Sequence, residues 1–196
     1  MNPEPRRAVF LDRDGTINEE VGFLRDPAQV RLIPGAAQAI VRLRAAGLAV
    51  VVVSNQSGLA RGIFSHAELA AVQAELERQL SLAGAILDGV FFCPHHPEGT
   101  VEGLGQVCAC RKPEPGLIQE AAGKLTLSLA GSFMVGDSRR DVACGNALGL
   151  TSILVHSGHP PAPAASPAEE PALVASDLAA AAEWILGRLA GEDGVR

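Results

Sequence analysis

Aromatic residues are scarce in this chain, which contains no tyrosine and one tryptophan among its 196 residues. Nucleic-acid binding through stacking of bases on aromatic rings therefore has little support. An excess of positive charge is also missing, because the formal net charge is −6 at pH 7, and this argues against general binding to polyanions. No apolar run has the length of a membrane span, and residues 1–7 lack the apolar part of a signal peptide. We therefore expect no nucleic-acid partner, no membrane partner and a cytoplasmic location.

Cysteine is sparse as well, with four residues in the chain. In a reducing cytoplasm, such residues are metal ligands or core residues more often than disulfides. Cys93 and His95 are followed, after twelve residues, by Cys108 and Cys110, and these are ligands of the kind that structural zinc uses. The one-residue gaps are tighter than those of common zinc fingers, so a reduced cluster without metal is the alternative. A metal would order the Gly-, Pro- and Glu-rich loop within residues 93–110.

Two carboxylates follow the apolar run at residues 8–11. Asp12 and Asp14 are two positions apart, so in an extended backbone their side chains point to the same side. Close carboxylates repel each other unless a cation or a shared proton relieves them, and Mg²⁺ is a hard cation that prefers oxygen ligands. The alternative is an ordinary surface turn, in which Asp and Gly are common.

Strand-like runs alternate with helical patterns along the chain, which predicts a Rossmann-like α/β/α fold of three layers with a mainly parallel sheet. Strands are expected at residues 8–11, 48–53, 89–92, 132–135 and 152–155. Helices are expected at residues 36–46, 67–82, 116–124, 141–148 and 177–189. Ligands of such sheets bind at the carboxyl ends of the strands, so we expect Asp12, Ser54 and Asp137 to lie close together.

The length suits one domain, and we expect residues 1–196 to form a single monomeric unit. The composition of residues 160–171, rich in Pro, Ala and Ser, predicts an exposed connection within residues 157–176.

Four motifs occur in the order typical of the haloacid dehalogenase superfamily of phosphatases and phosphotransferases, which the chain resembles. They are an acidic pair, a hydroxyl, a lysine and a second acidic residue, located at residues 9–16, 54–58, 111–113 and 136–141. Longer strings resemble the D-glycero-D-manno-heptose 1,7-bisphosphate 7-phosphatases, whose nearest relatives are the histidinol-phosphate phosphatases. These strings are FLDRDGTIN at 10–18, SNQSGLARG at 54–62, CPHHPEG at 93–99 and CACRKP at 108–113. The short spacing between motifs leaves no room for an inserted cap domain of ordinary size.

The resemblance implies a Mg²⁺-dependent phosphatase that works through an aspartyl-phosphate. Asp12 matches the nucleophile of the family, and Asp14 matches its general acid/base. Ser54 and Lys112 match the groups that stabilise the phosphate. The Mg²⁺ ligands implied are the Asp12 carboxylate, the Asp14 backbone carbonyl and the Asp137 carboxylate, and the Cys/His cluster is implied to hold a structural Zn²⁺. The positions that match substrate contacts are Gly22, Phe23, Asn55, Gln56, Ser57 and Arg111.

The chain departs from the family pattern at two positions. Phe23 stands where a tyrosine is expected, and Ser138 stands where a lysine commonly follows the acidic residue of the fourth motif. The second departure removes one cation from the site, and either Arg139 or Arg140 could replace it.

The resemblance implies removal of the 7-phosphate from a small phosphorylated sugar, a heptose 1,7-bisphosphate that serves lipopolysaccharide core or other surface glycans. One alternative is a histidinol-phosphate phosphatase. The string at residues 54–62 and the cation Arg111 favour the bisphosphate, because histidinol phosphate carries a remote ammonium group. An alternative of another class is a zinc-stabilised binding protein without catalysis, which the complete set of acidic residues and lysine opposes.

Overall fold

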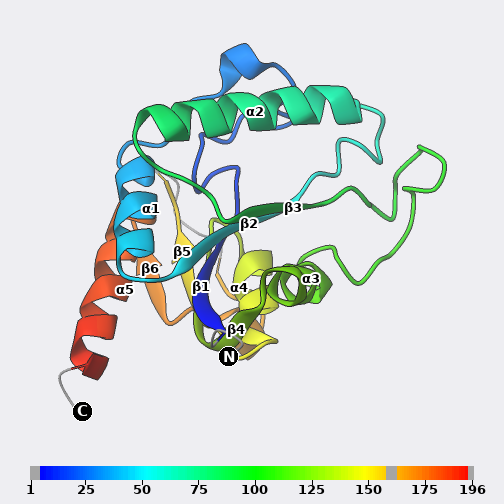
Figure 1. Ribbon diagram of the computed structural model, residues 1–196. Helices are drawn as coiled ribbons and strands as arrows, with labels where there is room; N and C mark the ends of the chain where they lie inside the picture. Colours follow the sequence, from blue (N-terminus) through cyan, green and yellow to red (C-terminus); the bar gives the residue numbers. More distant parts are fainter. Residues whose placement is uncertain (1–4, 158–162, 194–196) are drawn as a thin grey trace.

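The computed structural model describes residues 5–157 and 163–193, and Figure 1 shows one twisted sheet with helices packed around it. The six strands, all parallel, have the order β3-β2-β1-β4-β5-β6. They are β1 (Arg6–Leu11), β2 (Ala49–Asn55), β3 (Gly89–Cys93), β4 (Leu127–Gly136), β5 (Thr151–Val155) and β6 (Leu173–Ala175). The α-helices are α1 (Ala36–Ala45), α2 (His66–Leu82), α3 (Gly116–Leu125), α4 (Arg139–Asn146) and α5 (Leu178–Asp193). Two short 3-10 helices are η1 (Pro27–Gln29) and η2 (Pro167–Glu169).

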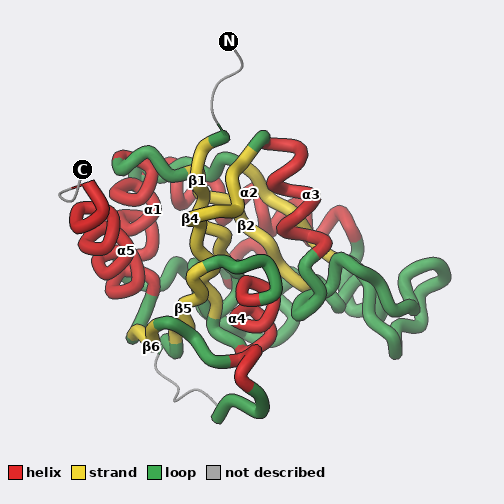
Figure 2. Tube along the Cα trace, turned by 90° about the horizontal axis from the view of Figure 1, so that it is seen from below, coloured by secondary structure: helices red, strands yellow, loops and turns green. Residues whose placement is uncertain are grey.

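The central strand β1 is buried on both faces, which explains its unbroken apolar sequence. Val9 and Leu11 point into the core beneath α1, α2 and α5, whereas Ala8 and Phe10 point into the core beneath α3 and α4. All four side chains are fully buried. Figure 2 shows α1 and α5 on one side of the strands and α3 and α4 on the other. The predicted α/β/α architecture is therefore confirmed.

The chain changes direction across the sheet between β1 and β4. From β1 the chain proceeds outward through β2 and β3, and from β4 it proceeds the opposite way through β5 and β6. In open parallel sheets, such a switch point leaves a crevice at the carboxyl ends of the two central strands. Leu11 pairs with Val52 of β2 and with Val135 of β4, so the residues that end these strands meet at one edge.

The five strands and five α-helices expected from the sequence are all present, with ends that differ by a few residues. The largest difference is the start of β4, which begins at Leu127 instead of 132. The sixth strand was missed, because Leu173–Ala175 falls in the segment 157–176 that we expected to be an exposed connection. This strand has three residues and owes its conformation to pairing with β5, which no local pattern reveals. Residues 158–162 of that connection lie outside the described residues.

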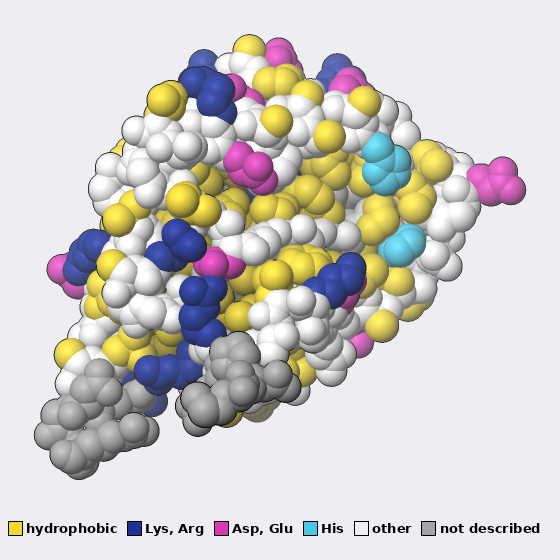
Figure 3. Space-filling view, in the orientation of Figure 1, with side chains coloured by type: hydrophobic (Ala, Val, Ile, Leu, Met, Phe, Trp, Pro, Cys, Tyr) yellow, Lys and Arg dark blue, Asp and Glu magenta, His cyan; other side chains and the backbone are white. Residues whose placement is uncertain are grey.

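Within the described residues, no helix is both long enough and apolar enough to cross a lipid bilayer. The face in Figure 3 carries charged side chains of both signs, scattered over it instead of gathered into one basic patch.

Asp88, just before β3, ties three elements together. Its carboxylate accepts hydrogen bonds from Arg6 Nη2 at 2.6 Å, Arg44 Nε at 3.1 Å and the backbone N–H of Val50 at 2.9 Å. These donors belong to β1, α1 and β2. Burial acts to raise the pKa of Asp88, but the hydrogen bonds from Arg44, Val50 and Arg6 outweigh it and hold the pKa below the ordinary value.

We expect Asp88→Asn to lower the free energy of unfolding by about 1–2 kcal/mol at pH 7, because three donors lose a charged acceptor. A carboxyl with a lowered pKa stabilises the fold above its unfolded pKa of 3.8 and loses that effect as the pH falls through its folded pKa. In urea titrations, the difference between wild type and variant should therefore shrink as the pH falls below 3.8 and vanish below the folded pKa of Asp88.

The matched control is Glu120→Gln, which removes an exposed ion pair with Lys124 inside α3 and should leave stability nearly unchanged. Equal stability of Asp88→Asn and wild type at pH 7 would show that the hydrogen bonds of Asp88 do not stabilise the fold.

Candidate active site

A cavity of about 220 Å³ opens at the carboxyl edge of the sheet, over the switch point between β1 and β4. Its lining brings together every residue that the sequence predicted for catalysis, Mg²⁺ binding or substrate contact. Those residues are Asp12, Asp14, Gly22, Phe23, Ser54, Asn55, Gln56, Ser57, Arg111, Lys112 and Asp137. The cavity is also lined by residues outside that prediction, namely Glu20, Gly58, Phe64, Ser138, Arg140 and Asp141.

Lys112 is a buried cation held between two carboxylates. Its Nζ lies 2.9 Å from Asp12 Oδ1 and 2.5 Å from Asp141 Oδ1, and it donates a hydrogen bond of 2.7 Å to the backbone oxygen of Val53. Burial acts to lower the pKa of Lys112, but the charges of Asp12 and Asp141 raise it above its ordinary value. The lysine therefore stays protonated although its side chain is only 2% exposed.

Asn55 fixes the backbone of Lys112. The Asn55 side-chain amide donates to the carbonyl of Lys112 and accepts from its N–H, both at 3.0 Å. We expected Asn55 to contact substrate, but both ends of its amide group are engaged by this lysine. The last residue of β2 thus sets the position of a residue 57 positions later in the chain.

Three carboxylates crowd the same point. Oxygen atoms of Asp12, Asp137 and Asp141 all lie within 4.8 Å of one another. Burial raises the pKa of Asp12 to about 6 against the opposing charge of Lys112, and the charges of Asp141 and Asp14 add to the rise. Burial, followed by the charges of Asp12 and Asp141, raises the pKa of Asp137 to about 7. One lysine therefore does not balance the negative charge of the cluster.

This cluster fits a hard divalent cation. The side-chain donors are all carboxylate oxygens, the ligands that Mg²⁺ prefers, and their mutual repulsion is what a bound cation would relieve. Gly15 lies against the Asp137 carboxylate with a φ of +74°, and a Cβ at this position would overlap the carboxylate oxygen. Only glycine lets the backbone after Asp14 approach so closely.

Asp14 has a different environment from Asp12. Its carboxylate accepts from Arg13 Nε and Nη2 at 3.1 and 2.8 Å, from Asn18 Nδ2 at 2.9 Å and from Gln56 Nε2 at 3.0 Å. It is not one of the carboxylates gathered around Asp12. Three side chains hold Asp14 in one orientation at the wall of the cavity.

Sequence reasoning missed these supports of Asp14. Strand alternation places Arg13 on the opposite side from its two aspartate neighbours. The chain leaves the strand at Leu11, and the buried Arg13 side chain turns back to Asp14. Gln56, which we expected to touch substrate, also donates to Ser54 Oγ at 3.0 Å. Ser54 and Gln56 are two positions apart, so in an extended backbone their side chains point to the same side. This spacing is the signal that could have predicted their hydrogen bond.

Asp141 has two partners, Ser138 and Lys112. Its Oδ2 accepts from Ser138 N at 3.0 Å and from Ser138 Oγ at 2.6 Å, at the start of α4, while its Oδ1 pairs with Lys112. A Cβ at Gly136 would collide with the Asp141 carboxyl group, so β4 must end in glycine for this side chain to fit.

The outer part of the cavity is built from loops. Phe23 is 45% exposed there, and Glu20 accepts from the N–H of Gly22. Arg111 Nη1 donates to the backbone oxygen of His95 at 3.3 Å. Of the two arginines that could replace the lysine missing at position 138, Arg140 lines the cavity.

The four Cys and His residues predicted to bind zinc come together beside this cavity. The Sγ atoms of Cys93, Cys108 and Cys110 lie 3.2–3.6 Å apart, and His95 Nδ1 lies 3.4 Å from Cys110 Sγ and 3.9 Å from Cys93 Sγ. The three cysteines of the cluster are free thiols. The edge of a zinc tetrahedron with Zn–S bonds of about 2.3 Å is roughly 3.8 Å, so the cluster fits a closed zinc site.

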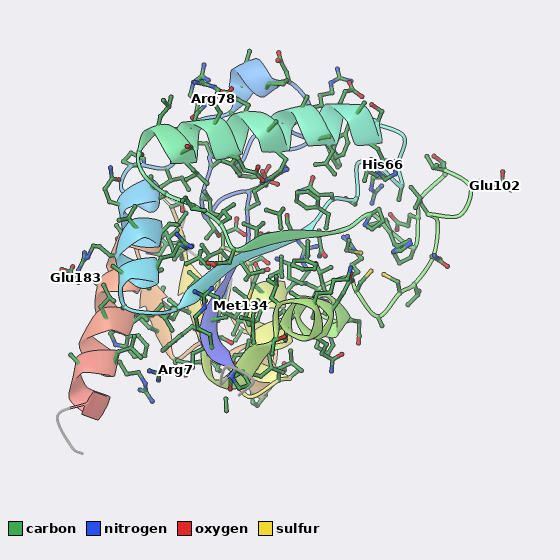
Figure 4. All side chains as sticks on the ribbon, viewed as in Figure 1. Arg7, His66, Arg78, Glu102, Met134 and Glu183 are labelled. Atoms are coloured by element: carbon green, nitrogen blue, oxygen red, sulfur yellow. The ribbon has the colours of Figure 1, made fainter. Side chains whose placement is uncertain are left out.

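The cluster joins the two ends of a long loop. Figure 4 shows sulfur atoms where the segment leaving β3 meets the segment leading to α3, while the tip of the loop, with Glu102, points away from the body. Cys110 directly precedes Arg111 and Lys112. Cys144 lies outside the cluster, buried on α4 in the core, and burial raises its pKa to about 12.

Comparisons with known proteins agree with this geometry. A family model described as HAD-hydrolase-like matches residues 109–181. The chain is 40% identical over 184 residues to the D-glycero-beta-D-manno-heptose-1,7-bisphosphate 7-phosphatase of Escherichia coli K12, covering 93% of this chain and 90% of that protein. It is 38% identical over 184 residues to the protein of the same name from Yersinia pestis, covering 93% and 91%.

Solved structures agree as well. A D,D-heptose 1,7-bisphosphate phosphatase from B. bronchiseptica, complexed with magnesium and phosphate, superposes with a TM-score of 0.77 at 37% identity, covering 93% of this chain and 99% of that one. A HAD-like phosphatase from Mesorhizobium loti superposes with a TM-score of 0.81, also at 37% identity, covering 93% and 88%. The resemblance found in the sequence motifs is thus confirmed: the chain belongs to the D-glycero-beta-D-manno-heptose-1,7-bisphosphate 7-phosphatase family of HAD-like hydrolases.

Proposed function

We propose that this protein is a Mg²⁺-dependent phosphatase that removes the 7-phosphate of D-glycero-β-D-manno-heptose 1,7-bisphosphate. The observation that carries the proposal is the buried group of Asp12, Lys112, Asp141 and Asp137 at the switch point of the sheet. Relatives about 40% identical over 93% of the chain bear the name of this activity. The product would serve the synthesis of lipopolysaccharide core or another surface glycan.

In this proposal Asp12 is the nucleophile. One of its carboxylate oxygens attacks phosphorus in line, a P–O bond to Asp12 forms, and the P–O bond to the sugar breaks. Lys112, 2.9 Å away, favours the ionised form of Asp12, which burial disfavours. When bound by Asp12, Asp137 and the backbone carbonyl of Asp14, Mg²⁺ would offset the repulsion between the anionic nucleophile and the anionic phosphate.

Asp14 acts as general acid and then as general base. It gives its proton to the sugar oxygen that leaves, and it later takes a proton from the water that hydrolyses the aspartyl-phosphate. The second step begins in the protonation state in which the first ends, so one carboxyl group serves both. Arg13, Asn18 and Gln56 are positioning residues in this scheme, because their hydrogen bonds aim the carboxyl group at the cavity.

Ser54 and Lys112 stabilise the phosphate oxygens. Ser54 Oγ accepts a hydrogen bond from Gln56 Nε2, so the hydroxyl hydrogen of Ser54 is available to a phosphate oxygen. Asn55 and Gln56 are positioning residues for Lys112, Asp14 and Ser54, and because they line the cavity we also propose them as substrate contacts. The other proposed substrate contacts, in the outer part of the cavity, are Gly22, Phe23, Ser57 and Arg111.

The cluster of Cys93, His95, Cys108 and Cys110 holds a structural Zn²⁺ in this proposal. Four protein ligands leave no open position for chemistry, so the zinc acts by fixing the segment that carries Arg111 and Lys112. Thiolate ligands require reduced cysteines, and we accordingly propose a cytoplasmic location. We also propose that residues 1–196 form one domain that works as a monomer, because all the residues of the site come from one chain.

The first prediction concerns Asp12→Asn, which should preserve the fold and lower kcat on any phosphate ester at least ~10³-fold, because a carboxamide is a poor nucleophile. Single-turnover measurements quenched in acid should find no hydroxylamine-labile phosphate on the variant. Asp26→Asn, which neutralises an exposed residue at the start of η1, is the control and should retain full activity. More than a few per cent of wild-type activity in the Asp12 variant would exclude this residue as nucleophile.

The second prediction concerns zinc. Metal analysis after purification in Mg²⁺ buffer should find about one zinc per chain, and Cys108→Ala should abolish it and lower the melting temperature. Cys144→Ala is the control, because this cysteine lies outside the cluster, and it should keep its zinc. Wild-type protein that is stripped of zinc and melts at an unchanged temperature would refute the structural role.

The third prediction concerns substrate. The kcat/KM for heptose 1,7-bisphosphate should exceed that for histidinol phosphate at least tenfold, with phosphate released from position 7. The remote phosphate of the sugar finds a cation in Arg111, whereas the ammonium of histidinol phosphate is repelled by it, and a charged hydrogen bond contributes about 1.5–3 kcal/mol. Equal or better use of histidinol phosphate would transfer the assignment to that activity, and no turnover of either ester would favour the non-catalytic alternative.

A further inference from the structure

A second cavity adjoins the catalytic one on the side of the zinc loop, with His96, Pro97, Val107 and Pro113 in its wall. Three residues line both cavities, and all three are cations: Arg111, Lys112 and Arg140. A substrate that reaches from Asp12 toward the second cavity must therefore pass these positive charges.

The three cations differ in what already neutralises them. Lys112 is paired with Asp12 and Asp141. Among the described residues, no ion pair gives Arg111 or Arg140 a carboxylate partner, and the one hydrogen bond of the Arg111 guanidinium goes to a neutral carbonyl. Two guanidinium groups at the junction of the cavities are thus available to an anion.

The positive charges also act on one another. Arg111 and Arg140 line the same two cavities, and both carry a positive charge. The second cavity has two acidic residues, Glu98 and Glu114, and Glu98 is already paired with Arg61 at 3.1 Å. Like charges this close are unfavourable in the absence of an anion between them.

The neighbouring arginine, Arg139, has a different position from Arg140 and contacts another part of the structure. Arg139 Nη1 donates to the backbone oxygen of Glu169 at 2.9 Å, so this side chain holds η2 against α4. Arg140 instead lines the two cavities, two positions after Ser138, where the family commonly has a lysine. The cation absent at position 138 is thus supplied from a different place on the same helix.

We propose that Arg140 is a specificity-determining residue of this chain, which binds the non-reacting phosphate of the bisphosphate together with Arg111. The inference rests on the proposed function and adds a residue to it. With one phosphate at Asp12, the other lies at the junction of the two cavities. A guanidinium offers two parallel donors to a phosphate, which suits a second arginine here better than a lysine.

The test compares two substrates that differ only in the remote phosphate, heptose 1,7-bisphosphate and heptose 7-phosphate. Arg140→Ala should lower kcat/KM for the bisphosphate about ten- to a hundredfold, mainly through KM, and leave the 7-monophosphate unchanged. Arg140→Lys should restore part of the loss, because it keeps the charge without the fork of donors. Arg139→Ala is the matched control and should leave the ratio of the two substrates unchanged.

The melting temperature of each variant is measured beside its kinetics to show that it is folded. If Arg140→Ala does not fold, Arg140→Gln replaces it. Suppose that the wild-type enzyme strongly prefers the bisphosphate, but the Arg140 variant lowers kcat/KM for both substrates equally or for neither. This result would overturn the role of Arg140 and leave the proposed function intact. Wild-type enzyme that does not hydrolyse the bisphosphate would overturn the proposed function and this inference with it.

Discussion

The site depends on one buried cation, Lys112, shared between the carboxylates of Asp12 and Asp141. A lysine loses its hydration when it is buried, and only close, opposite charges make its position tolerable. Each of the three groups comes from a different part of the chain: the end of β1, the loop before α3 and the start of α4. Removal of Lys112 would leave two neighbouring carboxylates without their cation, so the catalytic centre and the packing of these elements are not independent.

The parallel sheet makes this arrangement possible. Neighbouring parallel strands end at the same edge, and the switch point between β1 and β4 leaves space there that no crossover helix covers. The carboxylates that meet in this space are buried and repel one another, and burial followed by this repulsion raises the pKa values of Asp12 and Asp137. A site with such excess negative charge attracts a divalent cation, and a bound cation in turn makes the site acceptable to an anionic phosphate ester.

Substrate selection depends on the outer wall of the cavity and not on the buried charges at its base. The described residues contain no inserted cap domain, and the outer wall of the cavity consists of the loop after β1, the segment after the zinc cluster and the first turn of α4. The cluster at Cys93–Cys110 orders one of these segments, and Arg140 on α4 faces it across the junction of two cavities. Ser138, where the resemblance led us to expect a lysine, thus lies two residues before the arginine that we propose as a phosphate contact.

The sequence by itself determined the α/β/α architecture and the composition of the site, because unbroken apolar runs imply buried parallel strands and the motif order implies which strand ends meet. It also identified Cys93, His95, Cys108 and Cys110, since few other uses explain four such ligands in one loop. The tertiary structure alone decided that Arg13 turns back to Asp14, that Asn55 and Gln56 hold other residues of the site, that β6 pairs with β5, and that Arg140 instead of Arg139 reaches the cavity. These features depend on contacts between residues distant in the chain or on the direction of a single side chain, and local periodicity encodes neither.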